Sequence, residues 1–425
     1  MPQPVPQKAP AVAVAAPLAL AALAALAVLA GGALPAPAAS QPDFDGDVAF
    51  LRQHVQVVVL QDAPAGSRVA VVPAWQGRVM TSTTGGDPAP SYGWLNEELI
   101  ASRRLRPHMN AFGGEDRLWL GPEGGQFAIF FRKGDPFDLE HWQTPPMIDT
   151  EPWAIARRGP REVSFRHRGH LVNYSGTPLE VRIDRTVRLL DRAAAASALG
   201  GLPEAVRLVA FASENTLTNA GASAWTRTGG LLSLWVLGMF KPSPQATIVL
   251  PYQAGSEAER GPVVNDAYFG KVPADRLVDR GGRLVFKADG KYRGKIGLSP
   301  RRATSVAGSY DAAAGVLTIV TFDRPAGATD YVNSMWEIQK QPFAGDVVNS
   351  YNDGPPAPGA KPLGPFYELE TSSPAAALAP GASLSHVHRT FHLQGERSEL
   401  DALARQLLGV SLEAIEKALE SAASR

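Results

Sequence analysis

Apolar and polar residues alternate through much of this chain. Residues 162–166, 179–190 and 206–212 place apolar side chains at every second position, as strands do when one sheet face is buried and the other solvated. Further segments expected to form strands are 55–60, 69–73, 126–131, 231–240, 246–251, 282–288, 315–322, 333–340, 366–370 and 383–393. Gly/Pro-rich turns separate them without a fixed repeat length, which disfavours a propeller or solenoid. The pattern predicts an all-β protein built as a large antiparallel sandwich.

The end of the chain follows a helical period instead. Residues 398–408 and 411–423 are expected to be helices, with Ser398 and Ser411 placed to cap them. We expect these helices to form a short tail over residues 396–425 that packs on the sandwich. The apolar side chains expected to make that contact are Leu400, Leu403, Leu407, Ile415 and Leu419.

The N-terminus has the pattern of an export signal. Lys8 is the only charged side chain before Asp43, residues 11–30 are mostly Ala, Leu and Val, and Ala36-Pro37-Ala38 offers a cleavage site. A run this long could also serve as a membrane anchor, but its alanine content favours cleavage. We therefore predict a signal peptide over residues 1–39 and one sandwich domain over 40–395. The expected location is periplasmic or extracellular, with no stable membrane span after processing.

The overall composition excludes several classes of function. Lys plus Arg and Asp plus Glu number 41 each, so there is no basic surplus for nucleic acid. Cysteine is absent, which excludes disulfides, thiolate metal sites and a cysteine nucleophile. His386, His388 and His392 share strand parity and could bind a metal with help from other strands. The preferred interpretation is a polar sheet face, and neither a metal nor another cofactor is predicted.

Residues 108–127 gather most of the candidate chemistry. Carboxylates, an arginine and an indole lie here between two Gly-Gly pairs. A sugar site needs polar partners for hydroxyl groups and an aromatic ring for the apolar C–H face. The alternative is a surface turn with local salt bridges. Candidates for substrate binding in this segment are Asn110, Glu115, Arg117, Trp119 and Glu123. A second polar and aromatic cluster, at 137–145, adds Trp142.

Other candidates lie far from this segment in the sequence. Glu368 and Glu370 alternate along a predicted strand and should face the same side, where paired carboxylates would raise one pKa; two solvated glutamates are the alternative. Arg78 could bind a hydroxyl or a carboxylate, or only pair with a neighbouring acid. Trp235 is a stacking platform or a core residue. Asn352 and Asn349 are expected to lie in one turn. This turn either closes the site or has no role beyond reversing the chain.

Several segments carry a resemblance to a known family. They are Val72–Met80, Gly113–Gly125, Asp138–Trp142, Asn215–Asn219, Leu234–Phe240, Asn349–Gly354 and Tyr367–Thr371. Over about residues 48–395 the chain resembles a bacterial family of unknown function in the galactose mutarotase-like superfamily. The resemblance implies a β-supersandwich whose broad sheet holds a carbohydrate. Lyase and hydrolase domains share this superfamily, so fold alone does not decide the chemistry.

The resemblance also suggests which residues transfer protons. Opening a hemiacetal ring needs a base and an acid, and residues 369–371 resemble the mutarotase segment that supplies the base, which nominates Glu370. The mutarotase acid is a histidine, but the corresponding segment here, 231–240, has Trp235 and no histidine. The acid would then be His108 or His141. The predicted function is an exported carbohydrate-binding protein acting as a sugar mutarotase or epimerase. The alternatives are a non-catalytic glycan-binding protein and a polysaccharide lyase or hydrolase.

Overall fold

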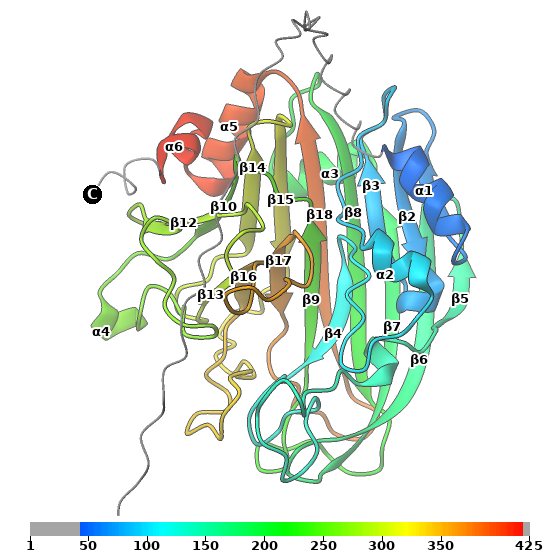
Figure 1. Cartoon of the computed structure of the whole chain (residues 1–425), viewed down its shortest axis with the longest axis vertical. Helices are drawn as coiled ribbons and strands as arrows, with labels where there is room; N and C mark the ends of the chain where they lie inside the picture. Colours follow the sequence, from blue (N-terminus) through cyan, green and yellow to red (C-terminus); the bar gives the residue numbers. More distant parts are fainter. Residues whose placement is uncertain (1–42, 420–425) are drawn as a thin grey trace, which may run out of the picture. The chain divides into compact units, whose positions relative to one another are not determined.

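Three antiparallel sheets make up the framework, and two of them cover one face of the third (Figure 1). The structure, a computed structural model, describes residues 43–419, all within the unit Pro42–Arg425. The signal peptide predicted over residues 1–39 lies outside the described residues.

The ten-stranded sheet runs from edge to edge through β11 (Leu277–Asp279), β12 (Arg283–Lys287), β10 (Ala246–Pro251), β14 (Val306–Asp311), β15 (Val316–Phe322), β18 (Ser383–Gln394), β8 (Arg207–Asn219), β7 (Pro178–Leu189), β6 (Glu162–Val172) and β5 (Ala154–Arg158). The five-stranded sheet consists of β13 (Gly294–Leu298), β16 (Val348–Asn352), β17 (Tyr367–Ser372), β9 (Ser233–Phe240) and β4 (Arg117–Gly121). The three-stranded sheet consists of β1 (Val58–Asp62), β2 (Ser67–Val72) and β3 (Arg78–Thr83). The helices are α1 (Phe44–Arg52), α2 (Glu97–Ser102), α3 (Arg192–Leu199), α4 (Glu257–Arg260), α5 (Arg397–Leu408) and α6 (Leu412–Lys417), with 3-10 turns η1 (Pro73–Trp75) and η2 (Pro146–Ile148).

The alternation in the sequence decides which face of the large sheet is covered. In β7, Leu179, Val181 and Ile183 are buried while the intervening Glu180 and Arg182 reach solvent. The buried set packs in one core with residues of β1, β2 and the five-stranded sheet. Burying one face of a strand and solvating the other is what a period of two produces. The predicted all-β supersandwich is confirmed.

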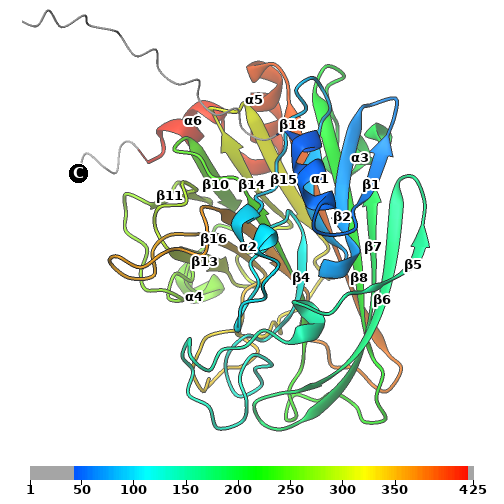
Figure 2. The same ribbon diagram turned by 45° about the vertical axis from the view of Figure 1, so that its right-hand side comes forward.

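The C-terminal helices cover part of the other face of the large sheet. Leu400, Leu403 and Ile415 are buried there against Leu317 and Ile319 of β15, and Figures 1 and 2 show α5 and α6 beside β14 and β10. The predicted helical tail is thus present over the described residues. No helix within residues 43–419 is both long and apolar enough to cross a membrane.

One predicted cap is wrong. Ser411 caps α6 by accepting a hydrogen bond from the amide of Ala414. The first residue of α5 is Arg397, and its N-cap is Glu396, whose side chain makes no capping hydrogen bond. Ser398 therefore lies inside the first turn of α5 instead of before it.

Three predictions of local structure are also wrong. Residues 126–131 form turns and bends, and the apolar pattern there arises because Phe130 and Phe131 are buried without joining a sheet. Residues 333–340 are irregular as well. The predicted turn with Asn349 and Asn352 is instead strand β16, which pairs with β13 and β17 along its whole length.

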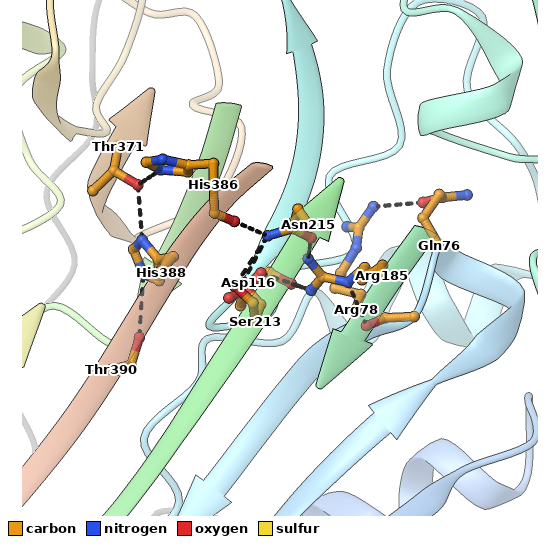
Figure 3. A network of polar contacts seen from close by, with 11 residues as sticks. Gln76, Arg78, Asp116, Arg185, Ser213, Asn215, Thr371, His386, His388 and Thr390 are labelled. Atoms are coloured by element: carbon orange, nitrogen blue, oxygen red, sulfur yellow. Dashed lines mark hydrogen bonds and ion pairs between the residues drawn. The ribbon is translucent and has the colours of Figure 1, made fainter. Parts of the chain in front are cut away.

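A polar network lies between the sheets and fixes their spacing (Figure 3). The Arg185 guanidinium of β7 donates to a carboxylate oxygen of Asp116 at 2.7 Å and to the side-chain oxygen of Asn215 at 2.7 Å. On β18, His386 and His388 each contact the Thr371 hydroxyl of β17, at 2.8 and 2.9 Å. These contacts fix the distance between β17 of the five-stranded sheet and β18 of the ten-stranded sheet. Satisfying buried polar groups in this way favours one arrangement of the two sheets.

Candidate functional site

A cleft lies over the face of the five-stranded sheet that points away from the ten-stranded sheet. The register places Glu370 opposite Leu237 of β9 and Asn349 of β16, and Trp119 opposite Trp235. Side chains from all five strands therefore project from this face. The cleft has a volume of about 170 Å³. Its lining includes Arg117, Trp119, Glu123, Trp142, Trp235, Phe269, Arg293, Lys295, Trp336, Tyr351, Asp353, Lys361, Leu363 and Glu368.

Arg117 and Glu368 form an ion pair at the base of the cleft. A guanidinium nitrogen of Arg117 donates to Glu368 Oε1 at 2.9 Å, and both side chains are almost fully buried. The guanidinium also lies 4.2 Å from the ring centroid of Trp119, a cation–π arrangement. Burial raises the pKa of Glu368 to about 8; Arg117 opposes the rise and the nearby Glu370 adds to it. Glu368 can therefore exchange a proton near neutral pH.

Lys295 and Glu370 form a second ion pair on the same face. The Lys295 ammonium lies 2.9 Å from Glu370 Oε2, and Trp235 Nε1 donates to that same oxygen at 2.9 Å. Glu370 Oε1 is buried and has no hydrogen-bond partner among the described residues. Burial lowers the pKa of Lys295, but the charges of Glu370, Glu123 and Glu368 outweigh it, and the pKa is raised overall. Lys295 therefore presents an ammonium group to the cleft, which it lines.

Glu123 is the third carboxyl group in this region. It borders the cleft, and its backbone N–H donates to the Ser334 hydroxyl. Burial raises the pKa of Glu123 to about 7, with Lys295 opposing the rise and Glu370 adding to it. Glu123 and Glu368 thus both border the cleft as carboxyl groups whose protonation changes within one unit or so of neutrality.

Indole rings form much of the cleft wall. Trp119 meets Trp235 edge to face, with ring centroids 5.6 Å apart. Trp142 and Trp336 are stacked at 5.9 Å, although they come from segments far apart in the sequence. Mutual packing fixes the orientation of these rings. They therefore offer rigid apolar faces next to the charged groups.

The structure brings together seven of the residues predicted from the sequence. Six border the cleft, namely Arg117, Trp119, Glu123, Trp142, Trp235 and Glu368. The seventh, Glu370, projects from the same face beneath them and contacts Lys295 and Trp235. Glu368 and Glu370 face one side of their strand, as predicted from their spacing.

Neither predicted histidine is among the residues that line the cleft. His108 Nδ1 lies 2.7 Å from the backbone oxygen of Trp142. This contact connects the loop that carries His108 to the segment that carries the Trp142 indole. His141 is partly exposed and pairs with Asp138 at 2.7 Å; the hydrogen bond to Asp138 raises its pKa.

Four other predicted residues lie in the structural framework instead of the cleft. Glu115 bonds to His392 of β18 at 2.9 Å and so links two sheets. The Asn110 side chain donates to Asp149, and Arg78 donates to the carbonyl oxygen of Gly113. Asn352 donates to the carbonyl oxygen of Tyr292. Each of these contacts fixes a loop whose position the sequence alone does not reveal.

Several cleft residues lie in segments whose sequence gives no signal of a site. Lys295 and Arg293 lie in a Gly-rich stretch around a short strand, β13, where no clear alternation is present. Trp336 lies in the irregular segment 333–340, whose pattern predicts a strand that does not form, and Phe269 lies in a loop without a recognisable motif. The alternation of Val348–Asn352 could have located Tyr351, because Asn349 and Tyr351 share one face of β16.

Comparisons with known proteins place the chain in a family. A model of the family of unknown function DUF6786 matches residues 42–419, and the chain belongs to this family. No curated protein matches it significantly.

Similar solved structures have low identity to this chain. The Slr1438 protein from Synechocystis sp. PCC 6803 is 12% identical, with 80% of this chain and 96% of that chain covered and a TM-score of 0.46. A galactose mutarotase-like protein from Lactobacillus casei is 11% identical, with 79% and 100% covered and a TM-score of 0.45. A galactose mutarotase related enzyme from Lactobacillus acidophilus is 8% identical, with 79% and 97% covered and a TM-score of 0.43.

Proposed function

We propose that this protein binds a saccharide in the cleft above the five-stranded sheet. The observation that carries the proposal is that Trp119 and Trp235 project from the same sheet face as the Arg117–Glu368 and Lys295–Glu370 pairs. A sugar ring has an apolar C–H face and an edge of hydroxyl groups. Rigid indoles match the first, and charged donors and acceptors match the second.

The cleft also supports catalysis of anomeric exchange or epimerisation. Ring opening needs one group that takes a proton and another that gives one. Glu123 and Glu368 border the cleft, and burial raises their pKa values to about 7 and about 8. We assign proton transfer to these two carboxyl groups in place of His108 and His141. Glu370 is then a positioning residue that holds Lys295 and the Trp235 indole.

Exchange spectroscopy by NMR on a panel of aldoses tests this assignment. Wild type should accelerate anomeric exchange of at least one sugar, and Glu123→Gln and Glu368→Gln should each slow it by about 10²-fold or more, the usual contribution of an acid–base group. His141→Asn is the matched control and should leave the rate unchanged. Loss of exchange in His141→Asn with full exchange in Glu368→Gln would refute the assignment.

Two results would redirect the proposal. Binding on a glycan array without exchange of any sugar would identify a non-catalytic glycan-binding protein. Release of unsaturated or reducing ends from a polysaccharide would identify a lyase or hydrolase. Both outcomes keep the cleft as the binding site but change the role of Glu123 and Glu368.

Export to the periplasm or the medium is also part of the proposal. It rests on the Ala-rich run over residues 11–30 and the small residues at 36–38. N-terminal sequencing of protein recovered from a periplasmic fraction should find a chain that begins near residue 40. A chain that keeps residue 1 and remains in the cytoplasm would contradict this.

A further inference from the structure

Arg293 differs from the other cations along the base and wall of the cleft. Arg117 and Lys295 are each bonded to a glutamate at 2.9 Å. The Arg293 guanidinium has no hydrogen bond or ion pair to another residue within 43–419, and its Nε is buried without a partner. Leaving a buried guanidinium N–H unpaired is costly. A ligand that supplies acceptor oxygens would remove that cost.

The Arg293 guanidinium lies over the face of the Phe269 ring. The guanidinium carbon lies 3.9 Å from the ring centroid, and both residues border the cleft. Stacking one face of the guanidinium on an aromatic ring leaves its N–H edge available for hydrogen bonds in its own plane. A planar fork of this kind matches two oxygens of one anionic group.

The remaining charges favour an anion. Lys361, also at the cleft and exposed, has no ion pair with another described residue. Asp353 also lines the cleft, but its two oxygens already accept hydrogen bonds from Tyr351 and from the Gly364 amide. Burial raises the pKa of Glu123 to about 7 and also raises that of Asp353. The charge of Arg293 opposes both rises, and the exposed Glu337 borders the adjoining pocket together with Arg293. Arg293 and Lys361 are nevertheless two cations that make no ion pair with another described residue here.

We infer that the saccharide bound in the cleft carries an anionic substituent, a carboxylate or a sulfate ester, which Arg293 holds through two parallel hydrogen bonds. Lys361 adds long-range attraction from the rim. The inference rests on the proposed saccharide-binding function and names the class of sugar.

Calorimetric titration compares acidic and neutral sugars directly. The probes are D-glucuronic acid, D-galacturonic acid and D-galactose 6-sulfate, with D-glucose and D-galactose as neutral counterparts. The acidic sugar that fits should bind at least about tenfold more tightly than its counterpart, because charge-assisted pairs contribute more than neutral hydrogen bonds. Raising the salt concentration should weaken binding of the acidic sugar and leave binding of the neutral sugars unchanged.

Variants of Arg293 separate its role from a general loss of folding. Arg293→Gln should lower the affinity for the acidic sugar about tenfold. Its affinity for neutral sugars should stay within about twofold of the wild-type value. Arg293→Lys keeps the charge but loses the planar fork, so it should recover only part of the affinity. Arg132→Gln, an exposed cation outside the cleft lining, is the matched control and should change nothing.

The outcomes distinguish this inference from the proposed function. Equal binding of acidic and neutral sugars, or an equal loss of both in Arg293→Gln, would overturn the inference and leave saccharide binding intact. Failure of every sugar to bind would overturn both. A preference for either the uronic acids or the sulfate ester supports the inference and identifies the anionic group.

Discussion

The buried imidazole of His386 should make the fold sensitive to acid. His386 is 1% exposed, and its Nε2 lies 2.8 Å from the Thr371 hydroxyl of β17 (Figure 3). Burial, with a smaller contribution from the neighbouring His388, lowers the pKa of His386 to about 3. The residue therefore remains neutral in the folded protein while the unfolded chain takes up a proton near pH 6.5.

The size and sign of the effect follow from proton linkage. Between about pH 6.5 and the folded pKa of about 3, the unfolded state binds more protons than the folded state, so stability falls as pH falls. With an unfolded pKa of about 6.5, the loss between pH 8 and pH 5 is about 2 kcal/mol for this one residue. The loss continues toward pH 3.

Urea unfolding of wild type and His386→Gln at pH 8 and pH 5 measures this contribution. The glutamine amide can replace the bond from Nε2 to Thr371 and does not titrate. The variant should lose about 2 kcal/mol less than wild type on acidification. Other titrating groups are present in both proteins and largely cancel in the comparison. A parallel loss in both proteins would refute a neutral, buried His386.

Two further predictions concern other buried charges. Arg185→Met should destabilise the protein by about 3–5 kcal/mol in urea unfolding, because it leaves Asp116 buried without its cation; a change under about 1 kcal/mol would show that Asp116 is not charged in the folded protein. The pKa of Glu368 is raised to about 8 by burial, so its contribution to stability is full below about pH 4.5 and is lost as pH rises toward 8. Glu368→Gln should therefore lose less stability than wild type between pH 5 and pH 9, and an equal loss would contradict the raised pKa.

Local patterns in the sequence predicted the framework well. The segment 246–251 forms β10 with the predicted bounds, and 179–190 forms β7 with the alternation that indicated it. In β7 one clear period matches one buried face. β10 is instead apolar and buried on both faces, because Val249 packs with the C-terminal helices while Ile248 and Leu250 pack on the opposite side. The strand predicted over residues 126–131 does not form, because buried aromatic residues in an irregular segment give the same pattern as a short strand.

The cleft was harder to predict because its parts meet only through long-range pairing. The bond between Arg117 and Glu368 joins residues 251 positions apart. Residue type and spacing were enough to select the glutamates and the tryptophans as candidates. They did not reveal the neighbouring side chains that determine the role of each residue. Lys295 comes from a five-residue strand with glycines at two positions, and nothing in that stretch indicates that its ammonium contacts Glu370. His108 and Glu115 have the residue types of a site, yet they serve the framework.

A crystal structure with a bound saccharide tests the central claim most directly. Crystals grown with the sugar that binds most tightly in titration should show its ring against Trp119 or Trp235, with hydroxyl groups within hydrogen-bond distance of Glu368 and Lys295. A sugar bound elsewhere on the protein, with the cleft filled only by water, would contradict the account.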